Sequence, residues 1–282
     1  MKRGTAVGLL VLHLGALAAL VPLFFNWWAV AVGVGLYYLT GGIGVSLGFH
    51  RILTHRSLRC PRWLEYALAV CGTLAMQAGP IAWVSTHRAH HAHTDREGDP
   101  HDVHRGLTWA HLTWLYRENA ARPELAEQLR LTPDLATVPF YRFLDRTYLF
   151  WQIALGGLLF ALGGWPFVVW GIFVRTVFTY HITWLVNSAA HHSGYRSFRT
   201  GDESRNNWWV ALLTWGEGWH NNHHAFPFSA RHGLRWFELD TTWLAIRVLA
   251  AVKLARDVKL PTALQLVAAR RRAEPRRTSQ AP

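Results

Sequence analysis

Three short clusters of histidine are the residues of this chain whose types and spacing most clearly suggest chemistry. They are His50-Arg-Ile-Leu-Thr-His55, His87-Arg-Ala-His-His91 and His220-Asn-Asn-His-His224, and they contain eight of the 17 histidines. Neutral imidazole is a good ligand for iron, copper, nickel or zinc. Eight ligands are too many for one mononuclear site, so the clusters predict two metal ions held close together.

The spacing within the second and third clusters suits one turn of an α-helix. Positions i, i+3 and i+4 share a helix face, so His87, His90 and His91 can converge, and the third cluster repeats this pattern. His50 and His55 are five positions apart, which is about 140° around an ideal α-helix. This pair therefore requires either two metals or an unwound helix end.

A fourth segment, Asn187-Ser-Ala-Ala-His191, adds a polar pair at i and i+4 beside an apolar stretch. Asn187 could simply bond a neighbouring helix, whereas coordination is the better prediction for His191. Asp99 and Asp102 could orient ligating imidazoles. The remaining histidines are predicted to be structural, solvated or supporting: His13, His93, His101, His104, His111, His181, His192 and His232.

Four apolar stretches must position these clusters. They cover about 5–25, 27–49, 147–164 and 165–188, and each of the longer ones can cross a hydrocarbon layer about 30 Å thick. Gly163-Gly164-Trp165-Pro166 separates the last two as a tight turn. Trp27, Trp28, Trp165 and Trp184 stand where an interfacial aromatic belt would lie. Buried helices of a soluble enzyme are the alternative, but four such stretches would overfill a core of this size.

Basic residues orient the two predicted hairpins. They precede the first stretch at Lys2 and Arg3, return after the second, and end the chain in an arginine-rich tail, while both short connectors are uncharged. By the positive-inside rule, both termini and the histidine clusters are cytoplasmic. Residues 1–25 could instead be a cleaved signal peptide, but the apolar stretch that follows almost at once favours an uncleaved span.

The chain is predicted to be one all-α integral membrane domain over 1–265, with four transmembrane helices in two hairpins. A helical cytoplasmic cap, 50–146 and 189–265, would hold the metals, and 266–282 would be a basic, disordered tail. The net charge of +12 fits anionic lipid headgroups or a phosphate-bearing carrier better than nucleic acid, for which no motif is present. Cys60 and Cys71 are too few for a disulfide framework.

No serine, cysteine or P-loop nucleophile motif competes with the clusters, and no His-Glu-x-x-His zinc signature is present. An all-histidine pair of irons suits oxidation of an unactivated C–H bond, where the metal performs the difficult step. The membrane would deliver a lipidic substrate.

These segments, in order, resemble the membrane fatty acyl desaturases, and in particular the bacterial and cyanobacterial Δ9 branch of the stearoyl-CoA desaturase-like enzymes. The resemblance is carried by His50–His55, by the run from Trp83 through His91 to Asp99-Pro-His-Asp102, by Trp184–His191, and by Gly216-Glu-Gly-Trp-His-Asn-Asn-His-His-Ala-Phe-Pro227. It extends from about the second apolar stretch to about Leu254.

The resemblance implies a four-helix membrane stem with a cytoplasmic cap and a dinuclear iron centre. One iron would take His50, His55, His87, His91 and His223, and the other would take His90, His191, His220 and His224, with a water held by Asn187. The implied reaction is O2-dependent formation of a cis double bond, most simply Δ9, in an acyl chain carried as acyl-CoA or acyl-lipid. Two electrons would come from an external ferredoxin or cytochrome b5-like donor. Zinc could replace iron in recombinant protein.

Two other functions remain open from the residues. The same metal chemistry serves hydroxylases or ketolases of other lipids, which the clusters separate poorly from desaturases. A metal transporter would place its polar residues through the spans, but here the histidines gather at one predicted membrane face.

Overall fold

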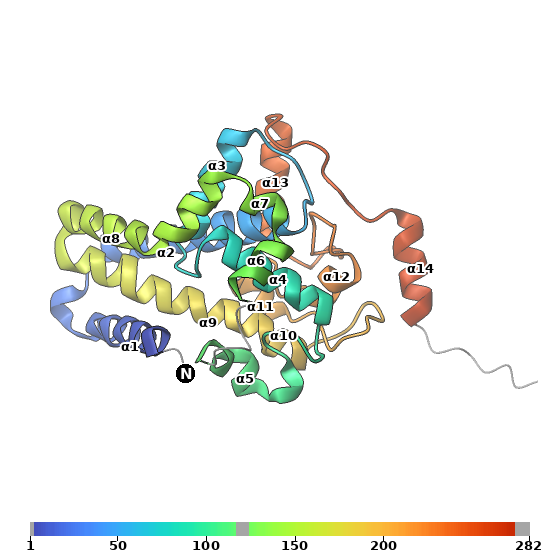
Figure 1. Ribbon diagram of the computed structural model, residues 1–282, viewed down its shortest axis with the longest axis horizontal. Coiled ribbons are helices and arrows are strands. Elements are labelled where there is room, and N and C mark those ends of the chain that lie inside the picture. Colours follow the sequence, from blue (N-terminus) through green and yellow to red (C-terminus); the bar gives the residue numbers. More distant parts are fainter. Residues whose placement is uncertain (1–2, 117–123, 274–282) are drawn as a thin grey trace, which may run out of the picture.

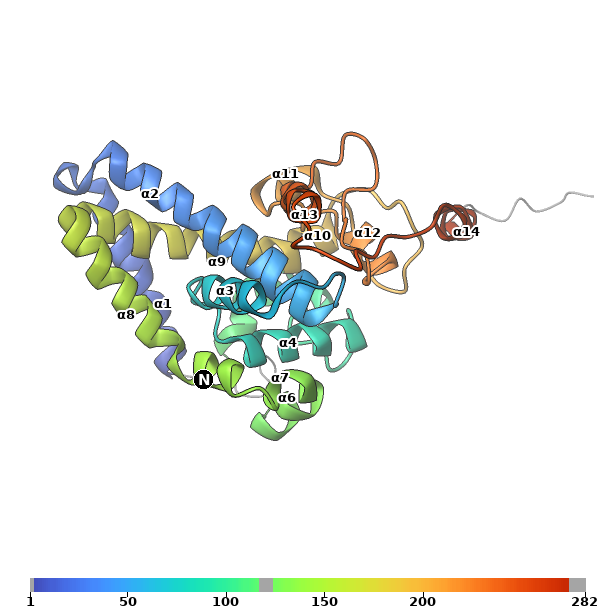
Figure 2. The same cartoon turned by 90° about the horizontal axis from the view of Figure 1, so that it is seen from above.

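The computed structural model describes residues 3–116 and 124–273, and this part of the chain is helical with three isolated backbone bridges and no strand. Four long helical segments form a bundle at one end, and the shorter helices gather at the other (Figures 1 and 2). The long segments are α1 (Arg3–Leu17), α2 (Trp27–Tyr37) with its continuation η3 (Tyr38–Thr54), α8 (Pro139–Val168), and η6 (Val169–Val174) with α9 (Arg175–Asn187).

Three stretches of helix are long and apolar enough to cross a membrane, namely Arg3–Leu20, Trp27–Thr54 and Pro139–His192. The third is not straight, because Gly163 and Gly164 leave helical geometry and Gly164 has a φ of +65°. Pro166 then opens the next segment, where its missing N–H costs nothing. The predicted turn at 163–166 is therefore confirmed, and the helix before it begins at Pro139, upstream of the predicted stretch 147–164.

Tryptophans border these segments as an interfacial belt requires, with one exception. Trp27, Trp28 and Trp165 are well exposed, but Trp184 is only 5% exposed and packs with Leu9, Leu12 and Tyr180. The prediction that Trp184 belongs to the belt was wrong, because α9 turns this residue toward α1 instead of outward.

The second long segment changes its winding before the first histidine cluster. η3 is a π-helix of 17 residues that continues to Thr54, beyond the predicted apolar stretch 27–49. Its bonds run from i+5 to i, as from the His55 amide to the His50 carbonyl at 3.1 Å. In this wider winding a residue lies much closer, around the helix axis, to the one five positions earlier than it does in an α-helix. His50 and His55 consequently share a face, with ring centroids 4.8 Å apart, without any unwound end.

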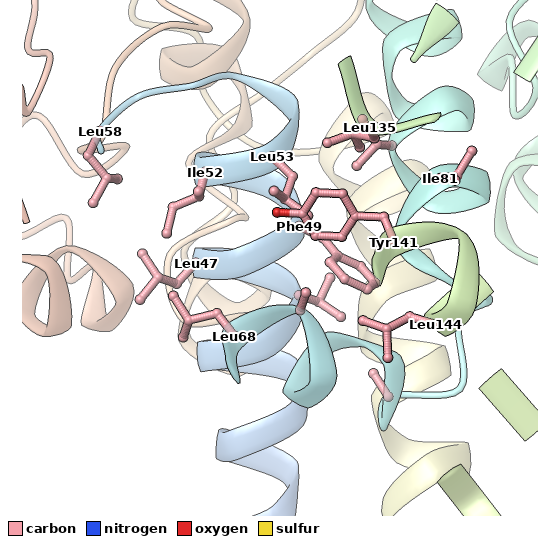
Figure 3. Close-up of a cluster of buried hydrophobic side chains, with 14 of the residues drawn as sticks. Leu47, Phe49, Ile52, Leu53, Leu58, Leu68, Ile81, Leu135, Tyr141 and Leu144 are labelled. Carbon is pink, nitrogen blue, oxygen red and sulfur yellow. The ribbon is translucent and has the colours of Figure 1, made fainter. Parts of the chain in front are cut away.

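The core under the shorter helices is built on η3 and α3 (Arg62–Thr73). A Cβ at Gly44 would overlap the backbone at Cys71, and one at Gly48 would lie 3.1 Å from the Leu68 carbonyl oxygen, so the two glycines allow α3 to lie directly on η3. Figure 3 shows this core, to which η3 contributes Phe49 and α8 contributes Tyr141, together with apolar side chains from neighbouring helices.

Two 3₁₀ turns, η1 (Ala18–Leu20) and η2 (Pro22–Phe24), join α1 to α2, and the other remaining helices are also short. Their bounds are α4 Pro80–His93, η4 Val103–Arg105, α5 Leu107–His111, η5 Thr113–Tyr116, α6 Leu125–Leu131, α7 Pro133–Ala136, α10 Ala189–His192, α11 Trp208–Leu213, α12 His220–Ala225, α13 Thr241–Ala251 and α14 Ala263–Ala273. α14 stands apart from the rest in both views (Figures 1 and 2).

Helix α14 also corrects the expectation of disorder from residue 266 onward. Thr262 and Gln265 exchange hydrogen bonds between side chain and backbone, at 2.8 and 3.2 Å, which is a capping box that starts a helix. The helix runs to Ala273, and the part of the predicted tail beyond it lies outside the described residues.

Arg175 is an ionisable residue in an apolar span, and it is 2% exposed. Its guanidinium donates to the Leu74 and Gly171 carbonyl oxygens, at 2.7 and 2.9 Å, and to Gln152 Oε1 at 3.3 Å. The charge thereby satisfies the carboxyl end of α3, where helix carbonyls otherwise lack partners. Arg175 joins three helices and has no part in the histidine groups.

Candidate metal centre

The fold brings nine of the predicted histidines into two adjacent groups. In each group, one nitrogen from every ring lies within 4.8 Å of all the others. The first group contains His50, His55, His87, His91 and His223, and the second contains His90, His191, His220 and His224. Helices α4 and α12 each contribute to both groups, because neighbouring positions on one helix turn diverge slightly. Two short helices thus fix the separation of the groups.

The ring nitrogens of the first group converge on one point. Nε2 of His223 lies 3.2 Å from Nε2 of His50 and 2.9 Å from Nε2 of His91, and Nε2 of His87 lies 3.1 Å from those of both His91 and His55. An imidazole nitrogen has one in-plane lone pair or one N–H, so it cannot hydrogen-bond two such neighbours at once. Ligands about 2.0–2.1 Å from a metal, as for zinc, and about 90–110° apart would have these spacings of roughly 2.9–3.4 Å. The residues therefore fit a metal ion.

The second group has the same character. Nε2 of His220 and His224 are 3.1 Å apart, and Nε2 of His90 and of His191 are buried without a hydrogen-bond partner. Leaving such atoms unpaired is costly in a folded protein, unless they face a ligand. Four inward-facing nitrogens again fit a metal ion.

Carboxylates hold the outer nitrogens of these rings. Nδ1 of His90, His191 and His224 donates to Asp99, Asp95 and Asp202 respectively, at 2.9–3.0 Å. Because a carboxylate only accepts, each Nδ1 must carry the proton, and each Nε2 presents its lone pair inward. Asp99 was predicted in this role. Asp95 and Asp202 were missed, because Asp202 lies 22 positions before its histidine and Asp95 lies 96 positions before His191.

Glu217 serves the first group from a buried network. It accepts from His50 Nδ1 at 2.7 Å, also from Ser46, and lies 3.2 Å from His232 Nδ1. Arg51 is fully buried beside it, and its guanidinium donates to Asp240 at 2.9 Å and reaches Glu217 at 3.4 Å. His232, which the sequence indicated as structural, thus supports the site from behind.

Burial and hydrogen bonding favour the neutral form of several of these histidines and the charged form of Asp202. Burial, and then mutual repulsion among the rings, lowers the pKa of His87, His90, His91, His220 and His223 well below its usual value. Burial alone would raise the pKa of Asp202, but hydrogen bonds from His224, Ser204 and Thr200 hold it well below its usual range. Neutral imidazole is the form that binds metal, so the site is preset for that role.

Asn221 and Asn222, between the histidines of the third cluster, anchor the loops around the site. Asn221 Oδ1 accepts from the amides of Ser197 and Phe198, at 2.7 and 2.8 Å. Asn222 donates to the His232 carbonyl oxygen and to Glu238, at 2.9 and 2.8 Å. The loop that carries Asp202 is thereby tied to α12.

The other histidines separate into three kinds. His101 is buried with its ring centroid 4.3 Å from that of His90, while His93, His104 and His192 are exposed. Asp102 contacts His104 and none of the nine, so its predicted orienting role was wrong. A separate row of three histidines joins α1, α9 and α5. The ring nitrogens of neighbouring members lie 3.0 Å apart, in the order His13, His181 and His111.

Two cavities meet beside the histidine groups. Both are lined by Trp83, His87, Thr183 and Asn187. The first continues toward Thr5 and Leu9 of α1, and the second reaches histidines of both groups. Gln77 holds the junction, donating to Thr183 at 2.9 Å and accepting from the Trp83 indole at 3.1 Å. An apolar chain in the second cavity would lie against both groups.

Comparison with known proteins agrees with this arrangement. Residues 6–256 match the fatty acid desaturase family. The chain belongs to this family. The desaturase is 56% identical over 249 residues to the sn-1 stearoyl-lipid 9-desaturase of Anabaena variabilis, covering 88% of this chain and 90% of that one. It is 54% identical to the enzyme of the same name from Synechocystis sp., covering 89% of this chain and 78% of the relative.

A plant relative is nearly as similar to the desaturase. It is the chloroplastic palmitoyl-monogalactosyldiacylglycerol delta-7 desaturase of Arabidopsis thaliana, 51% identical over 94% of this chain and 71% of the relative. These matches make the chain an oxidoreductase, a fatty acyl desaturase, and its histidine groups and long apolar helices fit a metal centre in a membrane protein.

Proposed function

We propose that the desaturase introduces a cis double bond, at the Δ9 position, into a saturated acyl chain esterified in a membrane glycerolipid. The observation that carries this proposal is the second cavity, which is lined by His50 and His87 of the first group and by His90 and His220 of the second. An acyl chain there reaches both groups at once. The Anabaena and Synechocystis relatives are named as 9-desaturases of lipid-bound stearoyl chains, which favours lipid over a coenzyme A thioester.

Two irons are the proposed occupants of the histidine groups. His50, His55, His87, His91 and His223 would hold one. The other would be held by His90, His191, His220 and His224, with Asn187 acting through a water. When bound, the irons supply the O2-dependent oxidising power that an unactivated C–H bond requires. The overall reaction is balanced when O2, two electrons, two protons and one –CH2–CH2– unit give –CH=CH– and two waters.

The chain's own residues position the substrate and exclude water. Trp83 and Thr183 line both cavities, and their hydrogen bonds to Gln77 fix them where the cavities join. Buried indole and aliphatic surfaces hold methylene groups out of water, which favours binding by about 0.8 kcal/mol for each. The substrate is thereby held in register with the metals, as selective oxidation of one C–C unit demands.

The proposal also includes a membrane topology. The chain would cross a bacterial membrane four times, with the metal centre and both termini on the cytoplasmic side. The Gly163–Gly164 break divides the third long apolar stretch into two arms, and the basic residues favour this orientation. An external carrier, ferredoxin or cytochrome b5-like, would supply the electrons.

The test is expression of the wild-type chain in a host membrane, with His220→Ala as the control, followed by analysis of separated lipid classes. Mass spectrometry with double-bond localisation should find a new Δ9 monoene in intact glycerolipids from the wild type alone. A monoene that first appears in the coenzyme A pool would overturn the lipid assignment. A hydroxylated or ketonic lipid in its place would show a different oxidation.

A further inference from the structure

Trp215 forms part of the wall of the second cavity but belongs to neither histidine group. It precedes Glu217 by two positions and is 6% exposed. The same cavity is lined by histidines of both groups. A chain that extends past the metal pair in this cavity must meet the walls that Trp215 helps to form.

The indole cannot move back from the cavity. A Cβ at Gly41 would overlap its six-membered ring, and a Cβ at Gly42 would lie 3.1 Å from its Cδ1. The ring therefore rests on the bare backbone of η3. Tyr37 closes another side, with ring centroids 4.7 Å apart, and its hydroxyl donates to the Leu213 carbonyl oxygen. The wall is rigid because it is packed on backbone.

The backbone at Trp215 is in an unfavourable conformation for its residue type. Its φ is +57°, in the left-handed region where bulky residues are rare. The conformation is held by a hydrogen bond from the Thr242 amide to the Trp215 carbonyl oxygen, at 3.1 Å, and by one from the Gly216 amide to the Ala211 carbonyl oxygen, at 2.9 Å. The indole N–H is also buried without a partner. Strain and an unpaired donor cluster at functional sites, where the surrounding structure maintains them.

We propose that Trp215 limits how many methylene groups fit beyond the metal pair, and so sets the chain length that the desaturase accepts. This inference rests on the proposed function. Protein interiors are close-packed, so a chain that is one methylene too long cannot be absorbed by a wall held on backbone. A hydrophobic pocket discriminates a single methylene by about 10–200-fold in kcat/KM. Trp215 is a specificity-determining residue in this sense, with no role in the oxidation itself.

The experiment compares wild type, Trp215→Leu and Trp215→Phe in a host supplied with saturated chains of sixteen, eighteen and twenty carbons. The amount of monoene formed from each chain length is divided by the amount formed from the shortest chain. Protein level and bound metal are measured in the same samples. Trp215→Leu should raise the relative product from chains longer than the wild type prefers by about tenfold or more. Trp215→Phe should lie between the two. Trp208→Leu, a change at a tryptophan that is 67% exposed, should leave the ratios unchanged.

The ratio separates specificity from damage, because a destabilised enzyme loses product from all chain lengths alike. Unchanged ratios in both Trp215 variants, at normal metal content, would overturn the inference while leaving the desaturase function intact. If Trp215→Leu fails to fold, the same product ratio measured for Trp215→Phe tests the inference: a rise for longer chains supports it, and an unchanged ratio overturns it. Absence of any monoene from the wild type would overturn the proposed function, and this inference with it.

Discussion

Replacing Asp202 by Asn should release one of the two metals and leave the other in place. Asp202 Oδ2 accepts the Nδ1 proton of His224 at 3.0 Å. Its Oδ1 accepts from the Thr200 hydroxyl at 2.8 Å and from the Ser204 amide at 2.9 Å. An Asn that keeps the loop bonds on Oδ1 must point its NH2 at His224, so two donors face each other. In one outcome, His224 moves its proton to Nε2 and loses the lone pair that faces the metal. In the other, the side-chain amide of the introduced Asn turns over, and the Thr200 hydroxyl and Ser204 amide lose their acceptor.

The magnitude follows from the hydrogen bond that is lost. A bond to a charged group contributes about 1.5–3 kcal/mol, and a neutral one about 0.5–1.5 kcal/mol. The difference of roughly 1–1.5 kcal/mol is about a tenfold change in affinity. Loss of a carboxylate that hydrogen-bonds a ligating histidine typically weakens metal binding by about 10–100-fold. The change of tautomer at His224 moves this variant toward the upper end of that range.

The assay is metal retention by purified, iron-loaded protein against a graded series of chelator concentrations, read as metal per chain. Asp202→Asn should lose one metal at about 10–100-fold lower chelator than the wild type, while the second metal follows the wild-type curve. Asp102→Asn is the matched control, because within the described part of the chain the Asp102 carboxylate is paired with the well-exposed His104, at 3.3 Å, and with none of the nine histidines. Wild-type retention by Asp202→Asn would refute the orienting role, and simultaneous loss of both metals would refute two separately held ions.

Four further substitutions test other parts of the structure. His220→Ala should abolish desaturation in a chain that still inserts into membranes. Asn187→Ala should impair desaturation less completely, because Asn187 is proposed to act through a water and not as a direct ligand. Full activity of His220→Ala would show that the proposed ligand set is wrong. Arg175→Met should lower the free energy of unfolding by about 1–3 kcal/mol, because the buried Gln152 Oε1 would lose the guanidinium that donates to it at 3.3 Å; the loss would be seen as a lower thermal midpoint in detergent, and an unchanged midpoint would contradict this. Burial alone would raise the pKa of Asp134, but ion pairs with Arg88 and Arg56 hold it at about 2, below its usual 3.8. Its contribution to stability is present above pH 3.8 and is lost as the pH falls toward 2, so the thermal midpoints of wild type and Asp134→Asn should converge in that window; a constant difference would exclude the ion pair as its cause.

The helical class and the nine histidines were predictable because their signals are local. An i, i+3, i+4 pattern shows its shared face from sequence alone, as in the second and third clusters. His50 and His55 show the limit, because positions five apart do not share a face of an α-helix and the π-helix has no comparable sequence signature. Asp95 was out of reach for another reason. It meets His191 only through the tertiary fold, and no spacing rule connects them.

Trp184 illustrates the same difficulty at the membrane boundary. Tryptophan near the end of an apolar stretch is typical of the aromatic belt, yet the same residue also fills a helix interface well. Which of the two it does depends on the face that neighbouring helices cover. For Trp184 that neighbour is α1, from the far end of the sequence.

The wide separation of the histidines along the chain has a consequence for biosynthesis. His50 and His223 touch across 173 positions, and η3, α4, α10 and α12 each supply part of the ligand set. Neither ion can find its full set of ligands until α12 has emerged and docked, so metal loading must be one of the last steps of maturation. Because metal binding adds directly to the free energy of folding, a chain stalled before that step would be left with its lowest stability. The supply of the metal should therefore govern how much of the protein survives in the cell, as well as how fast it works.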